Sequence, residues 1–380
     1  MAVNLRTVKI AAISALLLLL SIGGVFFAGY LIKLDREIRE RFAGARWALP
    51  AQVYAAPQEL YAGLALNARE LVHELQRLGY REDAGLAMTG TYTAGAQRVD
   101  LYARGFNFWD GPQPAQKLGV SFSGDLVTAV ADPASGEARD IVRLDPMLIG
   151  SIYPKQGEDR VLVKLSDLPP MLPKGLVAVE DHAFYSHSGV SLKAILRASL
   201  ANLRAGHVVQ GGSTITQQLV KNFFLNSGQT WNRKFNEAFM ALLLESHYSK
   251  DEILEAYLNE VHIGQDGSRA VHGFGLGAQF YFNKPLGELR PHEIALLVGI
   301  VKGPSYYNPR RNPARATERR NLALAIFRDE GLIDDAEYRQ DIQLPLGVVG
   351  GRGGGVERYP AFVELVKRQL ENDYKDDDLT

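Results

Sequence analysis

Residues 209–222 read VQGGSTITQQLVKN, a glycine pair that leads into hydroxyl and amide side chains at an expected helix start. Backbone N–H groups at such a start, together with Ser213, Thr214 and Lys221, form a cradle for a phosphate or for sugar hydroxyls. The stretch is not a Walker loop, because the Gly-Lys-Ser/Thr ending is missing. It is not a nucleophile elbow, because Ile215 stands where the second glycine would be. A plain capped helix explains the same residues, so both interpretations stay open here.

An acidic pair, Glu180-Asp181, precedes this stretch and closes the apolar run 175–179. Burial at the end of such a run would raise the pKa of Glu180 and suit it to accept a proton near neutral pH. The competing interpretation is a surface helix end with a capping acid. His182 and His187 follow, but histidines five residues apart do not share a helix face, so we predict no zinc site.

A cationic cluster follows the glycine pair. Arg233 and Lys234 lie four and three residues before Glu237, so all three side chains can share one helix face. The two cations favour the ionised carboxylate and would neutralise a pyrophosphate leaving group. A solvated helical salt bridge is the alternative. Residues 223–225 and Trp231 flank this cluster with large apolar side chains, which belong either to the core or to a bilayer interface.

Hydrophobic spacing predicts the elements around these motifs. A small α+β segment is expected first, with one helix over 67–78 that Gly79 ends and with short antiparallel strands. The strands are expected at 98–102, 117–122 and 126–130. From 162 to about 336 the pattern becomes helical, and Ser249 is a plausible cap. Those later helices are expected over 191–204, 233–247, 291–301 and 313–330.

Residues 10–32 contain no charge and include a run of five leucines. As a helix they would be about 34 Å long, enough to cross a hydrocarbon core of about 30 Å. A cleaved signal peptide, with a cleavage site at 43–45, is the alternative. Basic residues flank both ends, so charge alone does not fix the orientation. The expected organisation is a cytoplasmic tail (1–9), a transmembrane helix (10–32), a stalk (33–53), a small α+β domain (54–147), a helical domain (148–346) and a linker (347–380).

Composition limits the possible functions. The chain of 380 residues has 42 basic and 43 acidic side chains, and this balance argues against a nucleic-acid partner. Cysteine is absent, which excludes thiolate nucleophiles and Cys-ligated zinc or iron–sulfur clusters.

Taken together and in order, five motifs resemble the peptidoglycan glycosyltransferase family of class A penicillin-binding proteins. They are Glu180-Asp181 with Phe184, His187 and Gly189; Gly212-Ser213-Thr214 with Thr216-Gln217-Gln218; Arg233-Lys234 with Glu237; Lys250 with Ile253-Leu254-Glu255 and Tyr257-Leu258-Asn259; and Gly299 with Lys302-Gly303, Tyr307-Asn308-Pro309 and Asn312-Pro313. The small α+β domain is similar to the regulatory domain of the 1b-type members.

The resemblance implies a lysozyme-like helical glycosyltransferase domain that polymerises lipid II into glycan strands. It implies that Glu180 is the general base and that Glu237 assists it. The substrate-binding residues it implies are Asp181, His187, Ser213, Thr214, Gln218, Lys221, Asn222, Arg233, Lys234 and Lys302, with Asp181, His187 and Asn259 also shaping the site. No dedicated metal site is expected, although Mg²⁺ or Mn²⁺ on the substrate pyrophosphate is compatible with the family.

The resemblance also implies a location and partners. The protein would be a single-pass protein of a bacterial inner membrane, with its catalytic part in the periplasm. Residues 54–147 would bind an outer-membrane lipoprotein activator, and other cell-wall synthesis or division proteins are further expected partners. Class A members normally continue into a transpeptidase domain. Here Ser-x-x-Lys and Lys-Thr-Gly are missing, so we expect a truncated or naturally split protein without transpeptidase activity.

Two other functions stay open on the sequence. A lytic transglycosylase or lysozyme-like hydrolase would share the fold and a catalytic glutamate. A non-catalytic scaffold for cell-wall assembly would use the small α+β domain instead.

Overall fold

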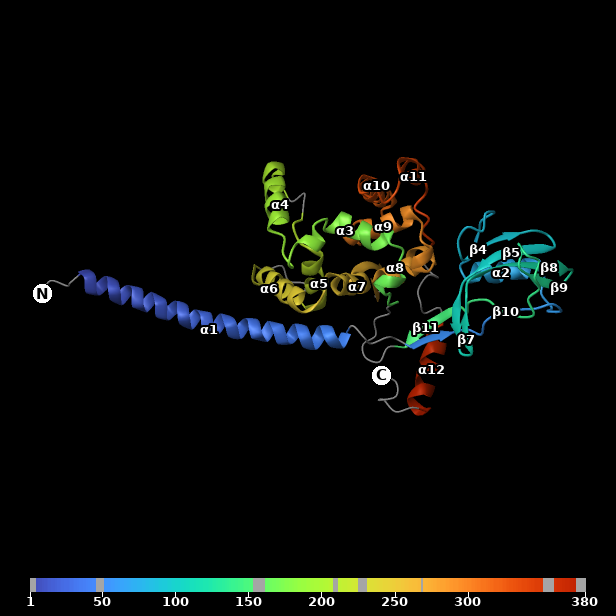
Figure 1. Ribbon diagram of the computed structural model, residues 1–380, viewed down its shortest axis with the longest axis horizontal. Helices are drawn as coiled ribbons and strands as arrows, with labels where there is room; N and C mark the ends of the chain where they lie inside the picture. Colours follow the sequence, from blue (N-terminus) through green and yellow to red (C-terminus); the bar gives the residue numbers. More distant parts are fainter. Residues whose placement is uncertain are drawn as a thin grey trace. The chain divides into compact units, whose positions relative to one another are not determined.

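The computed structural model describes residues 5–45, 51–152, 161–207, 211–224, 231–267, 269–350 and 359–373. These residues divide into two compact units. The first unit comprises residues 1–48 and 176–261, and the second comprises residues 49–175 and 262–380. Helices dominate and the strands are concentrated in residues 51–152 (Figure 1), so the predicted mostly α fold with a small α+β domain is confirmed.

Three helices form the centre of the first unit. Helix α5 (Ile215–Phe224) packs against both α6 (Trp231–His247) and α7 (Lys250–Glu260) (Figure 1). Ser249 caps α7 in a capping box with Glu252, as the sequence predicts. The other helical elements are the end of α3 (Met171–Glu180), the short turn η2 (Phe184–Ser186) and α4 (Leu192–Ala205), which Ser191 caps.

Helix α1 (Leu5–Ala45) continues without a break through the segment predicted to be a stalk. Within it, Leu17–Phe42 is long and apolar enough to cross a membrane, the one such helix among the described residues. Leu34, Ile38 and Phe42 lie on one face and are buried. The ring of Phe42 contacts the rings of Phe223 and Tyr248, with centroids 5.8 and 4.5 Å away. The last turns of α1 are therefore part of the core of the first unit.

The small domain in the second unit is a five-stranded sheet with α2 (Ala68–Arg77) packed on it. Asn67 forms a capping box with Glu70, and Gly79 adopts a φ of 79° just after the helix, as predicted. Leu71 and Leu75 pack on the strands in one core. In spatial order the strands are β3 (Arg81–Glu82), β4 (Thr91–Ala94), β5 (Arg98–Ala103), β8 (Gln116–Ser123) and β9 (Leu126–Ala131).

Short antiparallel pairs join the two ends of the small domain. Strand β1 (Ala51–Tyr54) pairs with β11 (Leu148–Ile152), and β2 (Glu59–Leu60) pairs with β10 (Val142–Arg143). A hairpin of β6 (Phe106–Phe108) and β7 (Gly111–Gln113) completes the domain.

The rest of the second unit is built around α9 (Pro291–Val301), which packs closely against α10 (Pro313–Asp329). Every residue from His292 to Val301 is buried. Gly299 faces the side chain of Arg319, where a Cβ would lie 3.1 Å from an Arg319 carbon. The remaining elements are η1 (Leu165–Asp167), β12 (His262–Asp266), β13 (Arg269–His272), α8 (Phe274–Phe282), η3 (Leu286–Glu288), α11 (Asp335–Asp341) and α12 (Pro360–Asp373).

Helix α12 lies in the segment that the sequence predicts as a linker. Its Val363 is buried and packs on β11 at Gly150, where any Cβ would lie 2.5 Å from a Val363 methyl group. The glycine-rich residues 351–355 lie outside the described part of the chain.

Candidate functional site

The start of α5 is a capped helix. The Thr214 hydroxyl donates to the carbonyl of Gly189 at 2.6 Å and accepts the N–H of Gln217 at 3.1 Å. The side-chain oxygen of Gln217 accepts the N–H of Thr214 at 3.1 Å, which completes a capping box. Both side chains are buried. The structure therefore gives Thr214 a helix-capping role, the plainer of the two interpretations of its motif.

Gly189 sets the spacing between this cap and α6. It adopts a φ of 85°, and a Cβ there would lie 2.5 Å from the carbonyl oxygen of Ala241. Only glycine accommodates both the backbone conformation and this close approach. The segment 180–189 is thus held directly against α6.

Glu180 is the last residue of α3 and is half-buried. The side-chain amide of Gln218, on α5, donates to one of its carboxylate oxygens at 3.2 Å. The Tyr257 hydroxyl, on α7, donates to the other end of that amide at 2.8 Å. The Glu180 carboxylate is thus held at the end of an apolar helix by a neutral amide donor.

Asp181 and His187 belong to a buried cluster behind Glu180. The Asp181 carboxylate accepts the N–H of Ile215 at 3.0 Å and lies 2.9 Å from His187 Nε2. Lys250 Nζ lies 3.4 Å from His187 Nδ1 and donates to Glu245 at 2.6 Å. Because a protonated lysine only donates, His187 accepts at Nδ1 and donates from Nε2 to Asp181. These contacts fix the ends of α3 and α5.

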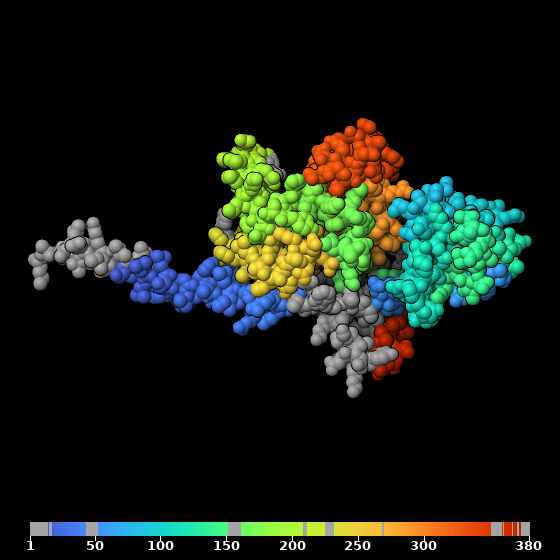
Figure 2. Space-filling model, in the orientation of Figure 1, coloured from blue at the N-terminus to red at the C-terminus, as the bar shows by residue number. Residues whose placement is uncertain are grey.

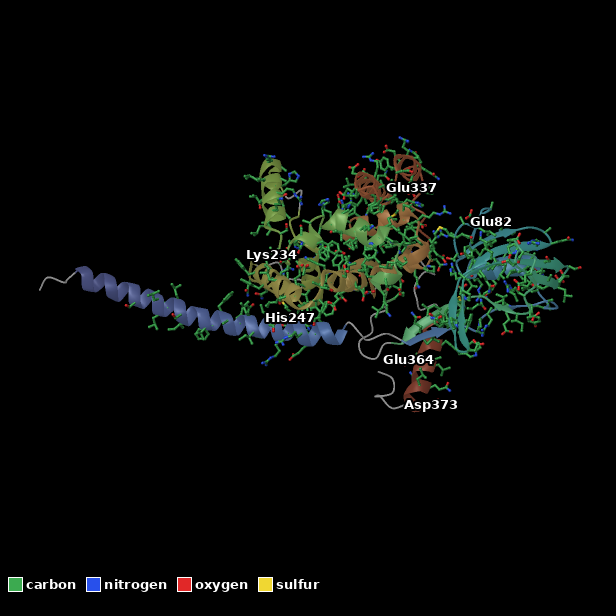
Figure 3. All side chains as sticks on the ribbon, viewed as in Figure 1. Glu82, Lys234, His247, Glu337, Glu364 and Asp373 are labelled. Carbon is green, nitrogen blue, oxygen red and sulfur yellow. The ribbon has the colours of Figure 1, made fainter. Side chains whose placement is uncertain are left out.

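Lys234 and Glu237 form an ion pair on α6. The side chain of Glu237 is 3% exposed and that of Lys234 is 45% exposed, so the pair presents a cation to solvent above a buried carboxylate. Lys234 Nζ also donates to the Ser213 hydroxyl at 2.9 Å. Figure 3 shows Lys234 near the opposite end of α6 from His247, which lies beside α1.

Helix α5 brings the two glutamates into one site. Gln218 contacts Glu180, and Ser213, five residues earlier, contacts the ion pair of Lys234 and Glu237. Ser213 lies two residues before the first residue of α5, and Gln218 lies in the first half of the helix, so one short segment contacts both the glutamate and the cation. A proton acceptor and a cation held by one short segment suit a reaction in which a hydroxyl attacks and an anion leaves.

The other predicted site residues differ in exposure. Lys221 and Asn222 are exposed on the last turn of α5, and Arg233 is partly buried on α6. Lys302 belongs to the second unit, where it is the exposed residue that ends α9. Asn259 donates to the carbonyl of Glu255 at 2.9 Å within α7. Among the described residues, no three His, Asp or Glu side chains are grouped to hold a metal ion.

The two phenylalanines at the end of α5 pack against α1. Phe224 is buried beneath Arg41, whose guanidinium carbon lies 5.8 Å from the ring centroid, and Phe223 contacts Phe42. These contacts with α1 favour the core interpretation of the two side chains over a bilayer contact.

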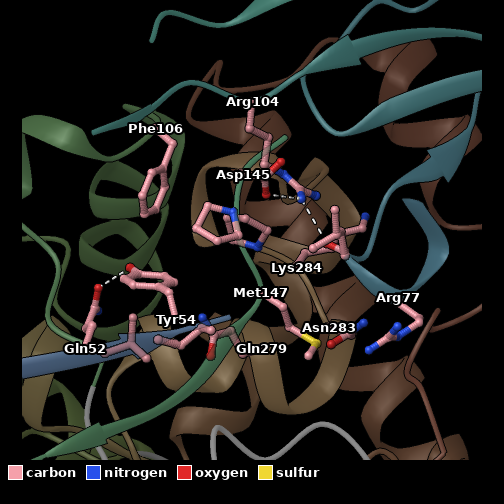
Figure 4. Close-up of a pocket in the computed structure, with 15 residues that line it drawn as sticks. Gln52, Tyr54, Arg77, Arg104, Phe106, Asp145, Met147, Gln279, Asn283 and Lys284 are labelled. Atoms are coloured by element: carbon pink, nitrogen blue, oxygen red, sulfur yellow. Dashed lines mark hydrogen bonds and ion pairs between the residues drawn. The ribbon is translucent and has the colours of Figure 1, made fainter. Parts of the chain in front are cut away.

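A pocket of about 300 Å³ lies in the second unit (Figure 4). Its cations are already paired: Arg104 with Glu288 and Asp145, and Lys284 with Glu293. Tyr54 and Phe106 line another wall.

Tyr257 and Glu245 are functional candidates that the sequence reasoning did not assign. Tyr257 lies in the motif that begins at Lys250, but its spacing also fits an ordinary core residue. Glu245 accepts from both Lys250 and Thr216, contacts that only the packing of α5, α6 and α7 creates.

Comparison with known proteins covers both parts of the chain. The family described as Transglycosylase matches residues 145–328, and the family described as Bifunctional transglycosylase second domain matches residues 60–144. The chain is 43% identical over 340 residues to Penicillin-binding protein 1B of Vibrio cholerae, covering 90% of this chain and 44% of that protein. It is 42% identical over 347 residues to Penicillin-binding protein 1B of Escherichia coli K12, covering 91% and 41%. The chain thus spans less than half the length of these relatives.

Proposed function

Because the chain belongs to the transglycosylase family, we propose that it is a peptidoglycan glycosyltransferase that polymerises lipid II. The 4-hydroxyl of the acceptor sugar attacks the anomeric carbon of the donor. A new C–O bond forms with inversion, the bond to the lipid pyrophosphate breaks, and the hydroxyl proton passes to Glu180. The leaving group is already anionic, so it needs cations more than it needs an acid.

The proposed roles follow from the contacts. Glu180 is the base, and Gln218 steadies its carboxylate by hydrogen bonding. Lys234 contacts the pyrophosphate, assisted by Arg233, and Glu237 holds Lys234 in place. Lys302, in the second unit, is proposed separately as a further phosphate-binding cation. Ser213, Lys221 and Asn222 line the donor side. Mg²⁺ or Mn²⁺ would be held chiefly by the pyrophosphate, with Glu237 as a protein carboxylate that could help to hold it.

The observation that carries this proposal is the contact between α1 and α6. The Tyr30 hydroxyl donates to Asn236 at 2.5 Å, and the rings of Phe27 and Phe239 lie 5.3 Å apart. Tyr30 lies in the last turn of the predicted membrane span, and Lys234 precedes Asn236 by two residues. With the span predicted over 10–32, this contact supports a position of the cation near the level at which a membrane lipid carries its pyrophosphate, which favours a lipid-linked donor.

A second surface supports contact with the bilayer. Helix α4 has an apolar face that remains exposed, and its polar face carries cations and no acid. Figure 2 shows this helix, in yellow-green, at the surface of the molecule. This pattern is typical of helices that lie in a membrane interface. The exposed apolar residues are Leu192, Ile195, Leu196, Leu200 and Leu203, and the cations are Lys193, Arg197 and Arg204. The proposed arrangement is a single span with the catalytic part in the periplasm.

The small domain is proposed to bind an outer-membrane lipoprotein activator. Its β6–β7 hairpin exposes Trp109, which is 79% accessible, beside the guanidinium of Arg143 at 5.3 Å from the ring centroid. Tryptophan and arginine are the residues most enriched at energetically important positions of protein interfaces.

The decisive experiment offers two substrates. Purified lipid II and finished glycan strands are incubated separately with the full chain in detergent micelles, and products are separated by size. A synthase converts lipid II into strands and releases undecaprenyl pyrophosphate. Cleavage of finished strands without polymerisation would instead identify a lytic transglycosylase, and inertness toward both substrates would favour a scaffold.

A further inference from the structure

We infer that Tyr257 is a positioning residue that keeps Glu180 in its proton-accepting form by fixing the orientation of the Gln218 amide. The inference rests on the proposed function and adds to it a residue to which no role has been given above. Three helices meet at this point: α3 supplies Glu180, α5 supplies Gln218 and α7 supplies Tyr257.

Tyr257 remains a donor under working conditions. Its side chain is fully buried, and this burial, with the nearby charges of Glu180 and Asp181, raises the pKa of Tyr257 well above its ordinary value. The Tyr257 hydroxyl donates a hydrogen bond to Gln218 Oε1 at 2.8 Å. Gln218 Nε2 is then turned toward Glu180 Oε2, 3.2 Å away.

The opposite orientation of the amide requires a protonated Glu180. If Gln218 were flipped, its oxygen would face the Glu180 carboxylate, and two acceptors would repel unless Glu180 carried a proton. In that state the buried Tyr257 hydroxyl would lose its acceptor, which is costly in the protein interior. The tyrosine therefore disfavours the flipped amide and, with it, the protonated glutamate.

Removing only the Tyr257 hydroxyl should remove the preference for the amide orientation that favours ionised Glu180. In Tyr257→Phe, Gln218 Oε1 loses its donor and can regain one from protonated Glu180. The acid limb of the pH–rate profile should then move to higher pH, whereas the packing of the ring is kept. Loss of a merely structural contact would lower the rate by the same factor at every pH.

The test is the initial rate of lipid II polymerisation by the full chain between about pH 5 and 9. We expect the acid limb of Tyr257→Phe to lie about one pH unit higher than that of wild type. Well below the limb, this shift corresponds to about a tenfold loss of rate. At high pH the rate should remain within about twofold of wild type. Tyr281→Phe, another buried tyrosine, in the second unit, should keep the wild-type profile.

A double variant provides the second arm. Gln218→Met removes the amide that carries the effect, so adding Tyr257→Phe to it should produce no further shift of the acid limb. An unchanged limb in Tyr257→Phe, a uniform loss at all pH values, or an equal shift in the Gln218→Met background would each overturn the inference. A wild-type chain that does not polymerise lipid II would overturn the proposed function, and the inference with it. If Tyr257→Phe does not fold, Gln218→Met still provides a test. Its acid limb should also move to higher pH, and an unchanged limb would overturn the inference because the amide would then carry no effect.

Discussion

Tyr30 donates a hydrogen bond of 2.5 Å to Asn236, a residue 206 positions later in the chain. The contact joins the predicted membrane span to the helix that carries Arg233, Lys234 and Glu237. Together with the buried face of Leu34, Ile38 and Phe42, it makes α1 a structural element of the first unit.

Substitution of Ile38 tests whether α1 stabilises the first unit. Ile38→Ala removes a fully buried side chain, so unfolding in detergent should become easier by about 2–5 kcal/mol. Ile32→Ala, on an exposed part of the same helix, should leave the denaturation midpoint nearly unchanged. Equal midpoints for the two variants would show that the packing of α1 contributes no stability.

Glu180→Gln is expected to abolish polymerisation and leave the fold intact. The glutamine oxygen still accepts from Gln218, whereas proton acceptance, worth about a hundred- to ten-thousand-fold in rate, is lost. Turnover of lipid II and circular dichroism provide the two measurements. Glu137→Gln, on the exposed surface of the small domain, is the matched control. Substantial remaining turnover in Glu180→Gln would remove Glu180 as the base.

Lys234→Met should impair both catalysis and stability. The charge-assisted contact to the pyrophosphate is worth about 1.5–3 kcal/mol, which corresponds to about a ten- to hundredfold loss in rate. The melting temperature should fall too, because the buried carboxylate of Glu237 loses its cation. Lys193→Met, on the exposed helix α4, provides the control. A variant with full activity would exclude Lys234 from the donor site.

The exposed leucines of α4 are expected to bind membranes. In a protein shortened to begin at residue 33, Leu196→Ser with Leu203→Ser should weaken partition into lipid vesicles by about tenfold or more. Leu322→Ser, which is half exposed on α10, should have no such effect. Sedimentation with vesicles measures the partition, and unchanged partition of the α4 variant would contradict this role.

Because His292 is buried, we expect the stability of the protein to fall at acid pH. Burial lowers the pKa of His292 to about 4 from its ordinary 6.5. Between these values the unfolded chain binds a proton that the folded chain excludes, so stability should fall as the pH drops through this window. The melting temperature of His292→Gln should vary less over the same range than that of wild type. Parallel curves would assign the acid sensitivity to other groups, and His207→Gln, at an exposed histidine, should follow wild type.

Local signals were sufficient to predict many of the elements. Ser249 was predicted as a cap because a cap is a contact among residues three positions apart. The helix from Pro291 to Val301 was predicted with the bounds it has. The family resemblance was confirmed for the same reason, because its motifs are short and ordered.

Contacts between distant segments were not predictable from those signals. The sequence did not reveal that α1 covers Phe223 and Phe224, and the exposed apolar surface is α4 instead. It gave no sign that a helix at Pro360–Asp373 packs on β11 through Val363. Nor did spacing show that Tyr257 and Glu180 form hydrogen bonds with the two ends of the Gln218 amide, since three helices must meet before those contacts exist.

Because α1 runs unbroken into the core, no flexible linker separates its apolar segment from the first unit. A flexible tether would let an enzyme sample a volume above the membrane, with its site at varying heights. Here one continuous helix of 41 residues, about 62 Å long, joins the apolar segment to the buried face at the end of α1. Under the proposed function, the enzyme and its lipid-linked donor would meet by diffusion in the plane of the membrane, and the finished glycan would leave along the membrane surface.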